Sequence, residues 1–276
     1  MERNPEVADS FYTGNKDRLK GQVEGFLRKA KLEGSAIKGA VSYVAPHAGY
    51  KYSGQVAAYA YKALSMRERL DKVDSFVMVG PNHTGLGCPI SVSAADWITP
   101  FGTVNNDTEL SNEIASQSGS IDIDEEAHSL EHSIEVQLPF LQEVIKGPRC
   151  CFVCMGDQSL DCCRILSSAI LNGAKGLGRN VVVIASSDFN HYESASIAQE
   201  KDMPAIDELK GLRPEQFHKK IRETGDSACG YGPITVSAMF AKGVGAGSGI
   251  VLKYSNSGEI TGDYGSVVSY SSIAFV

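Results

Sequence analysis

The sequence lacks any apolar run long enough to span a bilayer, and its polar N-terminal stretch, MERNPEVADSFYTGNKDRLK, lacks the apolar core of a signal peptide. It also lacks a basic patch, since 33 acidic residues outnumber 26 Lys and Arg and the net charge is −7. Such a charge argues against nucleic acid and anionic membranes as partners, because proteins bind both through clusters of Lys and Arg. We therefore expect a soluble, cytoplasmic protein.

An even set of cysteines, which is typical of a small disulfide-rich secreted domain, is also missing. The seven cysteines are spread over 276 residues and are expected to be reduced thiols that pack as small apolar side chains. In CCFVC, Cys151 and Cys154 lie on a predicted strand at positions that point to opposite faces. This pair therefore indicates core packing and not a metal site.

The sequence does contain β-branched apolar runs that alternate with amphipathic stretches, which is typical of a mostly parallel sheet flanked by helices. The predicted strands cover residues 37–45, 75–79, 150–155, 180–185, 250–255 and 267–275. The predicted helices cover residues 15–31, 53–68, 107–116, 133–145, 160–171, 197–210, 214–222 and 233–241, with Ser53 as the cap of the second helix. Because no linker or internal repeat interrupts this order, we predict a single α/β domain over residues 1–276.

Polar clusters follow three of the predicted strands. VSYVAPHAGY places His47 after the first strand, and FVMVGPNH places His83 after the second. VVVIASSDFNH places Asp188 and His191 after the fourth. Loops at the carboxyl ends of parallel strands converge at one edge of an open α/β sheet. We therefore expect these side chains to meet, although they are far apart in the sequence.

His47 and His83 are candidate metal ligands, because neutral imidazole binds iron, zinc and copper. Two His and one anionic ligand leave coordination positions open for water or substrate. Cys229, in the glycine-rich loop DSACGYGP, could supply a thiolate, and Asp188 with His191 could form a carboxylate–imidazole pair for acid–base catalysis. Each residue also has a structural alternative, namely a helix cap or carbonyl partner for either His, a buried thiol for Cys229 and an Asx-turn for Asp188.

The segment HSLEH, from His128 to His132, fits the His-x-x-Glu-His signature of one group of zinc peptidases. On a helix, His128 and His132 would share one face and Glu131 would be the general base. No downstream Glu is a clear candidate for the required third ligand. Alternatively, Glu131 and His132 enter the strand-end site from a loop that precedes the helix predicted at 133–145.

Taken in order, the motifs PHAGYKYSG, VGPNHTG, EHSIEVQLPFL, SSDFNHY and ACGYGP resemble those of the Memo family over nearly the whole chain. The resemblance implies a protein similar to AmmeMemoRadiSam system protein B, with a single α/β domain like that of the class III extradiol dioxygenases (LigB-like). It implies metal ligation by His47, His83 and Cys229. It further implies that Asp188 lies beside them and that His191 is the acid–base residue.

The related dioxygenases hold iron(II) with two His and one carboxylate, whereas this sequence offers the Cys229 thiolate. That replacement favours copper, zinc or a more electron-rich iron, and it argues against ring cleavage as such. The expected cofactor is iron(II), with copper and zinc as alternatives. Glu131, His132, Asn82 and Tyr50 lie in the same motifs and are expected to line the pocket.

Two functions are compatible with the resemblance. The first is a non-haem iron or copper oxidoreductase, dioxygenase-like, that acts on a small substrate. The second is a non-catalytic adaptor that keeps the pocket and binds a peptide or protein partner, since animal relatives are linked to peptide binding. A zinc peptidase acting through HSLEH is a third, remote alternative. Microbial relatives are associated with radical-SAM and AMMECR-like proteins, so a joint pathway is expected, and the sequence leaves room for a homo-oligomer.

Overall fold

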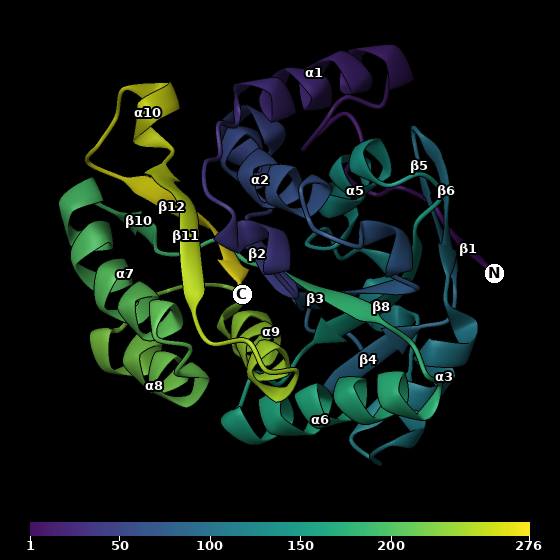
Figure 1. The fold of residues 1–276 in the computed structure, drawn as a ribbon. Helices are drawn as coiled ribbons and strands as arrows, with labels where there is room; N and C mark the ends of the chain where they lie inside the picture. The colour runs from purple at the N-terminus through teal and green to yellow at the C-terminus, as the bar shows by residue number, and fades with distance from the viewer.

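Four parallel strands form the centre of the sheet, in the spatial order β8 (Arg149–Met155), β3 (Ser75–Pro81), β9 (Val181–Ser186) and β2 (Ser42–Ala45). The computed structural model describes residues 1–276, except for the side chain of Ala36 (Figure 1). Every residue of these four strands is buried apart from Arg149. Because helices cover both faces, the strands are continuous apolar runs with no polar alternation.

Eight further strands extend this centre on both sides to give a sheet of twelve. The strands beyond β2 are antiparallel to their partners: β12 (Val267–Phe275), β11 (Gly249–Asn256) and β10 (His191–Glu193). The strands beyond β8 pair in both senses: β4 (Ile90–Ser93), β7 (Ile121–Ile123), β6 (Gly102–Asn106), β5 (Asp96–Thr99) and β1 (Glu2–Arg3). The predicted α/β sheet, mostly parallel and flanked by helices, is therefore confirmed, with a mixed arrangement at its edges.

Helices pack on both faces of the sheet, as Figure 1 shows. The first face is covered by α1 (Lys16–Lys29), α2 (Tyr50–Ser65) and α5 (Leu138–Val144). The second is covered by α3 (Thr108–Ser116), α6 (Leu160–Gly176) and α9 (Tyr231–Gly243). Side chains of β3 alternate between the two layers, because Phe76 and Met78 join the first core and Val77 and Val79 join the second.

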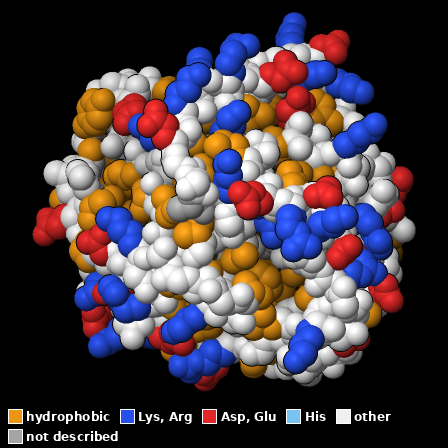
Figure 2. Space-filling view, viewed as in Figure 1, with side chains coloured by type: hydrophobic (Ala, Val, Ile, Leu, Met, Phe, Trp, Pro, Cys, Tyr) orange, Lys and Arg blue, Asp and Glu red, His pale blue; other side chains and the backbone are white. Residues whose placement is uncertain are grey.

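A third apolar cluster joins α7 (Ala195–Lys210) and α8 (Pro214–Thr224) to α9 and to the strands next to β2. The remaining helical segments are short: η1 (Ala36–Gly39), η2 (Leu70–Lys72), α4 (Glu126–Ser129), η3 (Glu135–Gln137) and α10 (Gly258–Thr261). Within the described chain, no helix is both long and apolar enough to cross a membrane. On the face seen in Figure 2, charged side chains of both signs are interspersed around apolar areas.

The strand predicted at 37–45 is shorter than expected, because Ala36–Gly39 form a 3-10 helix and β2 begins only at Ser42. This turn packs at the end of α2, where the Glu68 amide donates to the Lys38 carbonyl at 2.8 Å. The Lys38 carbonyl is therefore satisfied by the segment that follows α2 and not by a neighbouring strand.

The second helix begins earlier than predicted. It starts at Tyr50 with Gly49 as its N-cap, and not after Ser53. The Ser53 hydroxyl donates to the Ala48 carbonyl at 2.7 Å, so Ser53 satisfies an acceptor before the helix and does not cap it.

Candidate metal centre

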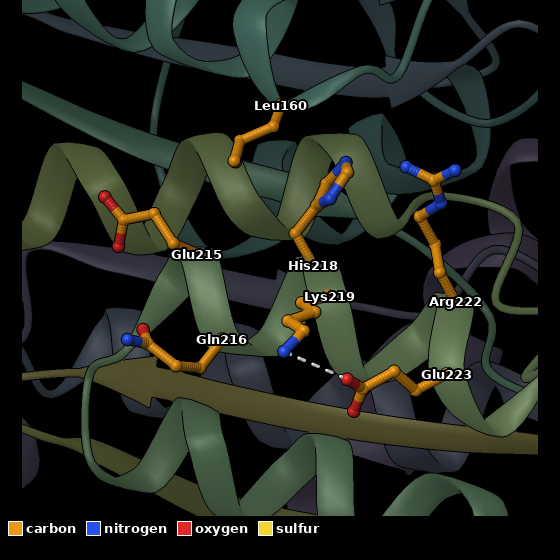
Figure 3. A pocket seen from close by; sticks show the side chains of 7 residues that line it. All are labelled: Leu160, Glu215, Gln216, His218, Lys219, Arg222 and Glu223. Atoms are coloured by element: carbon orange, nitrogen blue, oxygen red, sulfur yellow. Dashed lines mark ion pairs between the residues drawn. The ribbon is translucent and has the colours of Figure 1, made fainter.

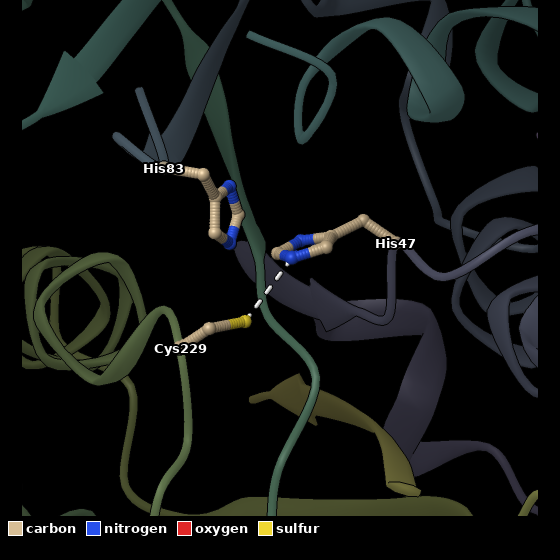
Figure 4. A group of neighbouring side chains, drawn as sticks. All are labelled: His47, His83 and Cys229. Atoms are coloured by element: carbon tan, nitrogen blue, oxygen red, sulfur yellow. Dashed lines mark hydrogen bonds between the residues drawn. The ribbon is translucent and has the colours of Figure 1, made fainter. Parts of the chain in front are cut away.

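Loops from neighbouring strands meet at the carboxyl edge of the sheet. Strands β2 and β3 both pair with β9, so His47 and His83, which follow them, are brought to the same edge. Cys229 reaches this edge from the loop that precedes α9. Ligand atoms of the three side chains all lie within 4.8 Å of one another. Figure 4 shows the two rings and the thiol turned toward a common point, so the fold brings the predicted ligands together.

His47 is buried, and its hydrogen bonds determine which ring nitrogen carries the proton. Its Nδ1 lies 2.9 Å from the Ser186 hydroxyl, which itself donates to the Ser133 carbonyl at 2.6 Å. A hydroxyl has one proton to donate, so Ser186 accepts from the Nδ1–H of His47. Gln137 Nε2 also donates to this hydroxyl, at 2.7 Å. The Nε2 atom of His47 is therefore left without a proton, and it faces Cys229 at 3.1 Å.

The ring of His83 is oriented in the same way by Glu131, whose side chain is fully buried. Glu131 Oε1 lies 2.9 Å from His83 Nδ1, and Oε2 accepts the His83 amide at 2.5 Å. Burial alone would raise the pKa of Glu131, but the hydrogen bonds with His83 and Ser133 and the attraction to His83 lower it to about 2. Because an ionised carboxylate only accepts, His83 Nδ1 carries the proton and Nε2 is bare.

The thiol of Cys229 completes the donor set. Burial and the nearby charge of Asp188 raise the pKa of this thiol well above its ordinary range, so without a counter-charge it keeps its proton. That proton is donated to the bare Nε2 of His47. A metal cation would replace it, since a cation stabilises the thiolate and binds both bare nitrogens. The three residues therefore fit a mononuclear iron, copper or zinc ion.

The loop that carries Cys229 is held on two sides. The Gly230 amide donates to the Ser187 hydroxyl at 2.9 Å, and Gln158 Nε2 donates to the Cys229 carbonyl at 2.8 Å. A Cβ on Gly230 would lie 2.4 Å from the Ser186 carbonyl oxygen. Only glycine permits this approach, so the glycine after the thiol places the loop against the end of β9.

Asp188 does not form the predicted pair with His191. Its Oδ1 atom instead accepts the backbone amides of His47 and Ala48, at 2.9 and 3.3 Å. Burial raises the pKa of Asp188 to about 7, against the lowering effect of these two hydrogen bonds. Asp188 therefore anchors the backbone of the His47 loop and does not orient an imidazole.

His191 is positioned by Ser227. Its amide donates to the Ser227 hydroxyl at 2.8 Å, and its Nδ1 lies 3.2 Å from the Ser227 carbonyl, which can only accept. The strand register shifts between His191 and Glu193, and Tyr192 between them has φ 63° and is 78% exposed. Because of this bulge, the His191 side chain points toward Ser227 and away from Asp188. Burial lowers the pKa of His191, so its ring is neutral at pH 7 and its Nε2 is bare.

The HSLEH segment does not form the zinc peptidase arrangement. Helix α4 ends at Ser129, so His128 and His132 do not share a helical face. The chain turns there around Arg3, whose guanidinium donates to the carbonyls of His128 and Glu131 at 2.6 and 2.7 Å. His128 is fully buried and is directed away from the centre, toward the core.

Glu131 and His132 nevertheless lie beside His83, and these three also offer ligand atoms within 4.8 Å of one another. Three of the roughly four lone-pair sites of the Glu131 carboxylate are already used, by the ring and amide of His83 and by a further backbone amide. Glu131 therefore orients His83 and is a poor metal ligand. The His132 ring stacks on His83 with centroids 4.5 Å apart and lies 5.4 Å from His47, so it lines the approach to the donor set.

Two residues expected to line the pocket have other contacts. The buried Tyr50 hydroxyl donates to the Val136 carbonyl at 2.7 Å, and its ring packs against Phe140 in the core. Asn82 closes the following turn, because its Oδ1 accepts the amides of residues 84 and 85 and its Nδ2 donates to the Leu86 carbonyl. A motif does not reveal which of its side chains point into the pocket and which point into the core beside it.

Residues that hold the ligands in place were not predicted from the sequence: Ser133, Gln137, Gln158 and Ser186. Ser186 carried a signal, because VVVIASSD changes from apolar to polar at the end of a buried strand. Gln137 lies in a helical segment, where no local pattern connects it with a histidine on another loop.

A cavity also lies over α8, away from the donor set. Its volume is about 610 Å³, and it is lined by Leu160 and by side chains of α8 that include His218 and Arg222. Figure 3 shows these side chains and the ion pair in which Lys219 and Glu223 are 3.2 Å apart. None of the predicted metal ligands lines it.

Comparisons with known proteins agree with this arrangement of motifs. A sequence profile described as Memo-like protein matches residues 3–274. A MEMO1 family protein of Methanopyrus kandleri is 40% identical over 283 residues, which cover 100% of this chain and 99% of its own. MEMO1 family proteins of Methanosarcina barkeri and Nitrosopumilus maritimus are 40% and 37% identical, and each match covers at least 98% of both chains. The chain therefore belongs to the Memo family, as its motifs predicted.

Proposed function

We propose that this protein is a non-haem metal oxidoreductase that holds one iron(II) or copper ion between His47, His83 and Cys229. The observation that supports this most is the proton arrangement of the two rings. Each His commits its Nδ1–H to a fixed buried acceptor and offers a bare Nε2 beside the thiol. Imidazole and thiolate ligands select iron, copper or zinc over magnesium and calcium. Iron(II) is the first choice, and zinc would fit the same donors without redox chemistry.

A bound ion of this kind would supply redox chemistry and Lewis acidity at the edge of the sheet. The protein supplies fixed ring orientations, because Ser186 and Glu131 are buried and each holds one imidazole. It also supplies an approach from one side, since His47 is 2% exposed whereas the side chain of His83 is 33% exposed. We expect a small substrate to enter over His83 and His132.

His191 is the proposed proton acceptor. Its Nδ1–H is committed to the Ser227 carbonyl, so the bare Nε2 is the atom that can take a proton from the substrate. It lies near the donor set, because a positive charge on its ring would lower the pKa of His47, whose pKa is lowered mainly by burial. Asp188 fixes the backbone next to the first ligand, because its carboxylate accepts the amides of residues 47 and 48.

The test is the metal content of full-length protein purified with and without oxygen. We expect about one iron or copper per chain from anaerobic purification, because the ligands are preformed. Cys229→Ala should lose this metal, and Cys88→Ala is the matched control, since Cys88 is also partly exposed but lies outside the donor set. Failure to bind iron(II) or copper supplied in excess would overturn the proposal and would favour the peptide-binding adaptor. Oxygen uptake with a panel of small aromatic substrates, compared with His191→Asn, then tests the oxidation itself.

A further inference from the structure

Two buried carboxyl groups lie beneath the loop that carries Cys229. Asp202 belongs to α7 and is completely buried, and Asp226 follows α8 and is 9% exposed. Neither belongs to the proposed donor set. Buried carboxyl groups are rare unless every oxygen has a partner, so the hydrogen bonds of this pair need to be accounted for.

Half of the four oxygens have donors. Asp202 Oδ2 accepts from the Ser269 hydroxyl at 2.5 Å and from the Tyr254 hydroxyl at 2.6 Å. Asp226 Oδ1 accepts the Ala228 amide at 2.9 Å. Asp202 Oδ1 and Asp226 Oδ2 are buried and have no donor among the described residues. The two side chains lie within hydrogen-bonding reach of each other. Carboxylates only accept, so one proton placed between the two groups would satisfy both remaining oxygens.

The charges around the pair do not replace that proton. The titratable groups that face it from α7, β10 and β11 are Lys201, His191 and Tyr254, and Glu193 on β10 pairs with Lys201. Strand β12 contributes the Ser269 hydroxyl, and α8 contributes apolar side chains of the third core cluster. Lys201 is the nearby cation, and it is committed to Glu193 at 2.8 Å and to the Gly225 carbonyl at 3.2 Å.

The pair is connected to the metal centre through four consecutive residues. Asp226 holds the Ala228 amide, Ser227 holds both the amide and the ring of His191, and Cys229 follows directly. We infer that Asp202 and Asp226 share one proton and, as positioning residues, hold segment 226–229 so that His191 and Cys229 keep their places. The catalytic consequence rests on the proposed function, whereas the proton-sharing pair itself does not.

Loss of the shared proton should loosen the segment. Burial, the charge of Asp202 and the hydrogen bond between the two side chains raise the pKa of Asp226 to about 8. Because this folded value lies above the unfolded one, the pair's contribution to stability is complete below about pH 4 and falls as the pH rises to about 8. Above that pH two carboxylates face each other in a buried space, and their repulsion should displace Asp226 and the residues that follow it.

The test measures order in the segment without using metal or substrate. Hydrogen exchange of residues 225–231 in the full chain, corrected for intrinsic rates, should show about a tenfold loss of protection between about pH 7 and pH 9.5. Asp226→Asn should keep its protection within about twofold, because the amide donates to Asp202 as the protonated acid does. Asp71→Asn is the control, since Asp71 is 73% exposed, and it should behave as the wild type does.

Carbon-13 NMR of the side-chain carboxyl groups gives a second measurement that needs no variant. The pair should lose one proton near pH 8. It should lose the other at a lower pH, so that one proton remains between the two groups at pH 7. The inference is overturned if both carboxyls titrate near pH 4, or if Asp226→Asn keeps the wild-type pH dependence. It is also overturned if a chelator at pH 7 abolishes protection, because a cation would then hold the oxygens.

An iron(II) titration at each pH separates this inference from the proposed function. Both proteins release the Cys229 proton when they bind the ion, so the ratio of the two affinities is the readout. We expect the affinity of the wild type relative to that of Asp226→Asn to be constant up to about pH 7 and to fall above about pH 8. A protein that binds no metal but shows the expected exchange and carboxyl titration would refute the proposed function alone.

Discussion

The proposed metal centre and the cavity over α8 contain similar kinds of side chain but differ in how these are held. At the centre, His47 and Glu131 are buried, and each is fixed by residues from other parts of the chain. Over α8, Glu223 is 43% exposed and pairs with two lysines of its own helix. Exposed pairs of this kind contribute little, because solvent and side-chain entropy offset the attraction.

The volume of a cavity alone does not identify the functional site. The cavity of about 610 Å³ offers space, yet the ion pairs on α8 beside it join exposed or half-exposed side chains of a single helix. The centre offers two bare ring nitrogens whose direction is set by buried acceptors. Catalytic and metal-binding groups need fixed geometry, so the site whose side chains are better held is the functional candidate.

The largest expected effect is on metal affinity in Glu131→Gln. Removing the charge that accepts His83 Nδ1–H should lower affinity for iron(II) about 10- to 100-fold, as is usual for partners of metal-bound His. Glu223→Gln, on α8, should leave affinity unchanged. Calorimetric titration of both variants is the measurement. Equal loss in the two variants would break the distinction between the regions.

The next effect is on stability in Gly230→Ala. The added Cβ would meet the Ser186 carbonyl oxygen at 2.4 Å, so the loop must shift, at a cost of about 1–3 kcal/mol. Gly247→Ala is the control, because a Cβ there meets no atom within 4 Å. Urea unfolding of both variants gives the free energies. A Gly230→Ala protein as stable as the control would contradict the close approach described above.

A third difference between the two regions is expected in the pH dependence of stability. Hydrogen bonds to His83 hold the pKa of Glu131 at about 2, below its unfolded value, so the resulting stability is present above about pH 4.5 and is lost as the pH falls toward 2. The loss should be on the order of 2 kcal/mol. Unfolding measured from pH 6 to pH 3 should be less steep in Glu131→Gln and unchanged in Glu223→Gln. If the free energy of unfolding of Glu131→Gln fell with acid as steeply as that of the wild type, the ionised Glu131 carboxylate would not be stabilised by the fold.

The smallest effect is expected for Arg222→Ala in the α8 cavity. Its removal should change the free energy of unfolding by less than about 0.5 kcal/mol and leave metal affinity unaltered, since it lines the surface away from the donor set. Thermal unfolding and metal titration check this. A strong loss of metal in this variant would mean that the two regions are coupled.

Much of the fold was predictable because its centre is apolar. The runs that form β3, β8, β9 and β12 were all predicted as strands from their apolar residues. The strand-end rule predicted that the loops of His47 and His83 would meet. The helix around Ser53 was placed too late, because Gly49 and Ser53 are both acceptable caps and only the packing selects one. Singling out Cys229 among seven cysteines required the family motifs.

The partners within the site were less predictable. Asp188 and His191 are close in sequence, but a bulge at Tyr192 sends them to different partners. The acceptors that set the two ring tautomers come from unrelated parts of the chain, and no local pattern identifies them. Such partners are determined by tertiary packing, which a pattern in one segment does not contain.

One further consequence follows from the distance along the chain between the ligands. Cys229 and His47 are 182 positions apart, so an ion held by both would act as a cross-link that closes a long loop. The free energy of unfolding would then rise with the logarithm of the free metal concentration. The amount of folded protein in a cell would in this way follow the metal supply, even at a constant rate of synthesis.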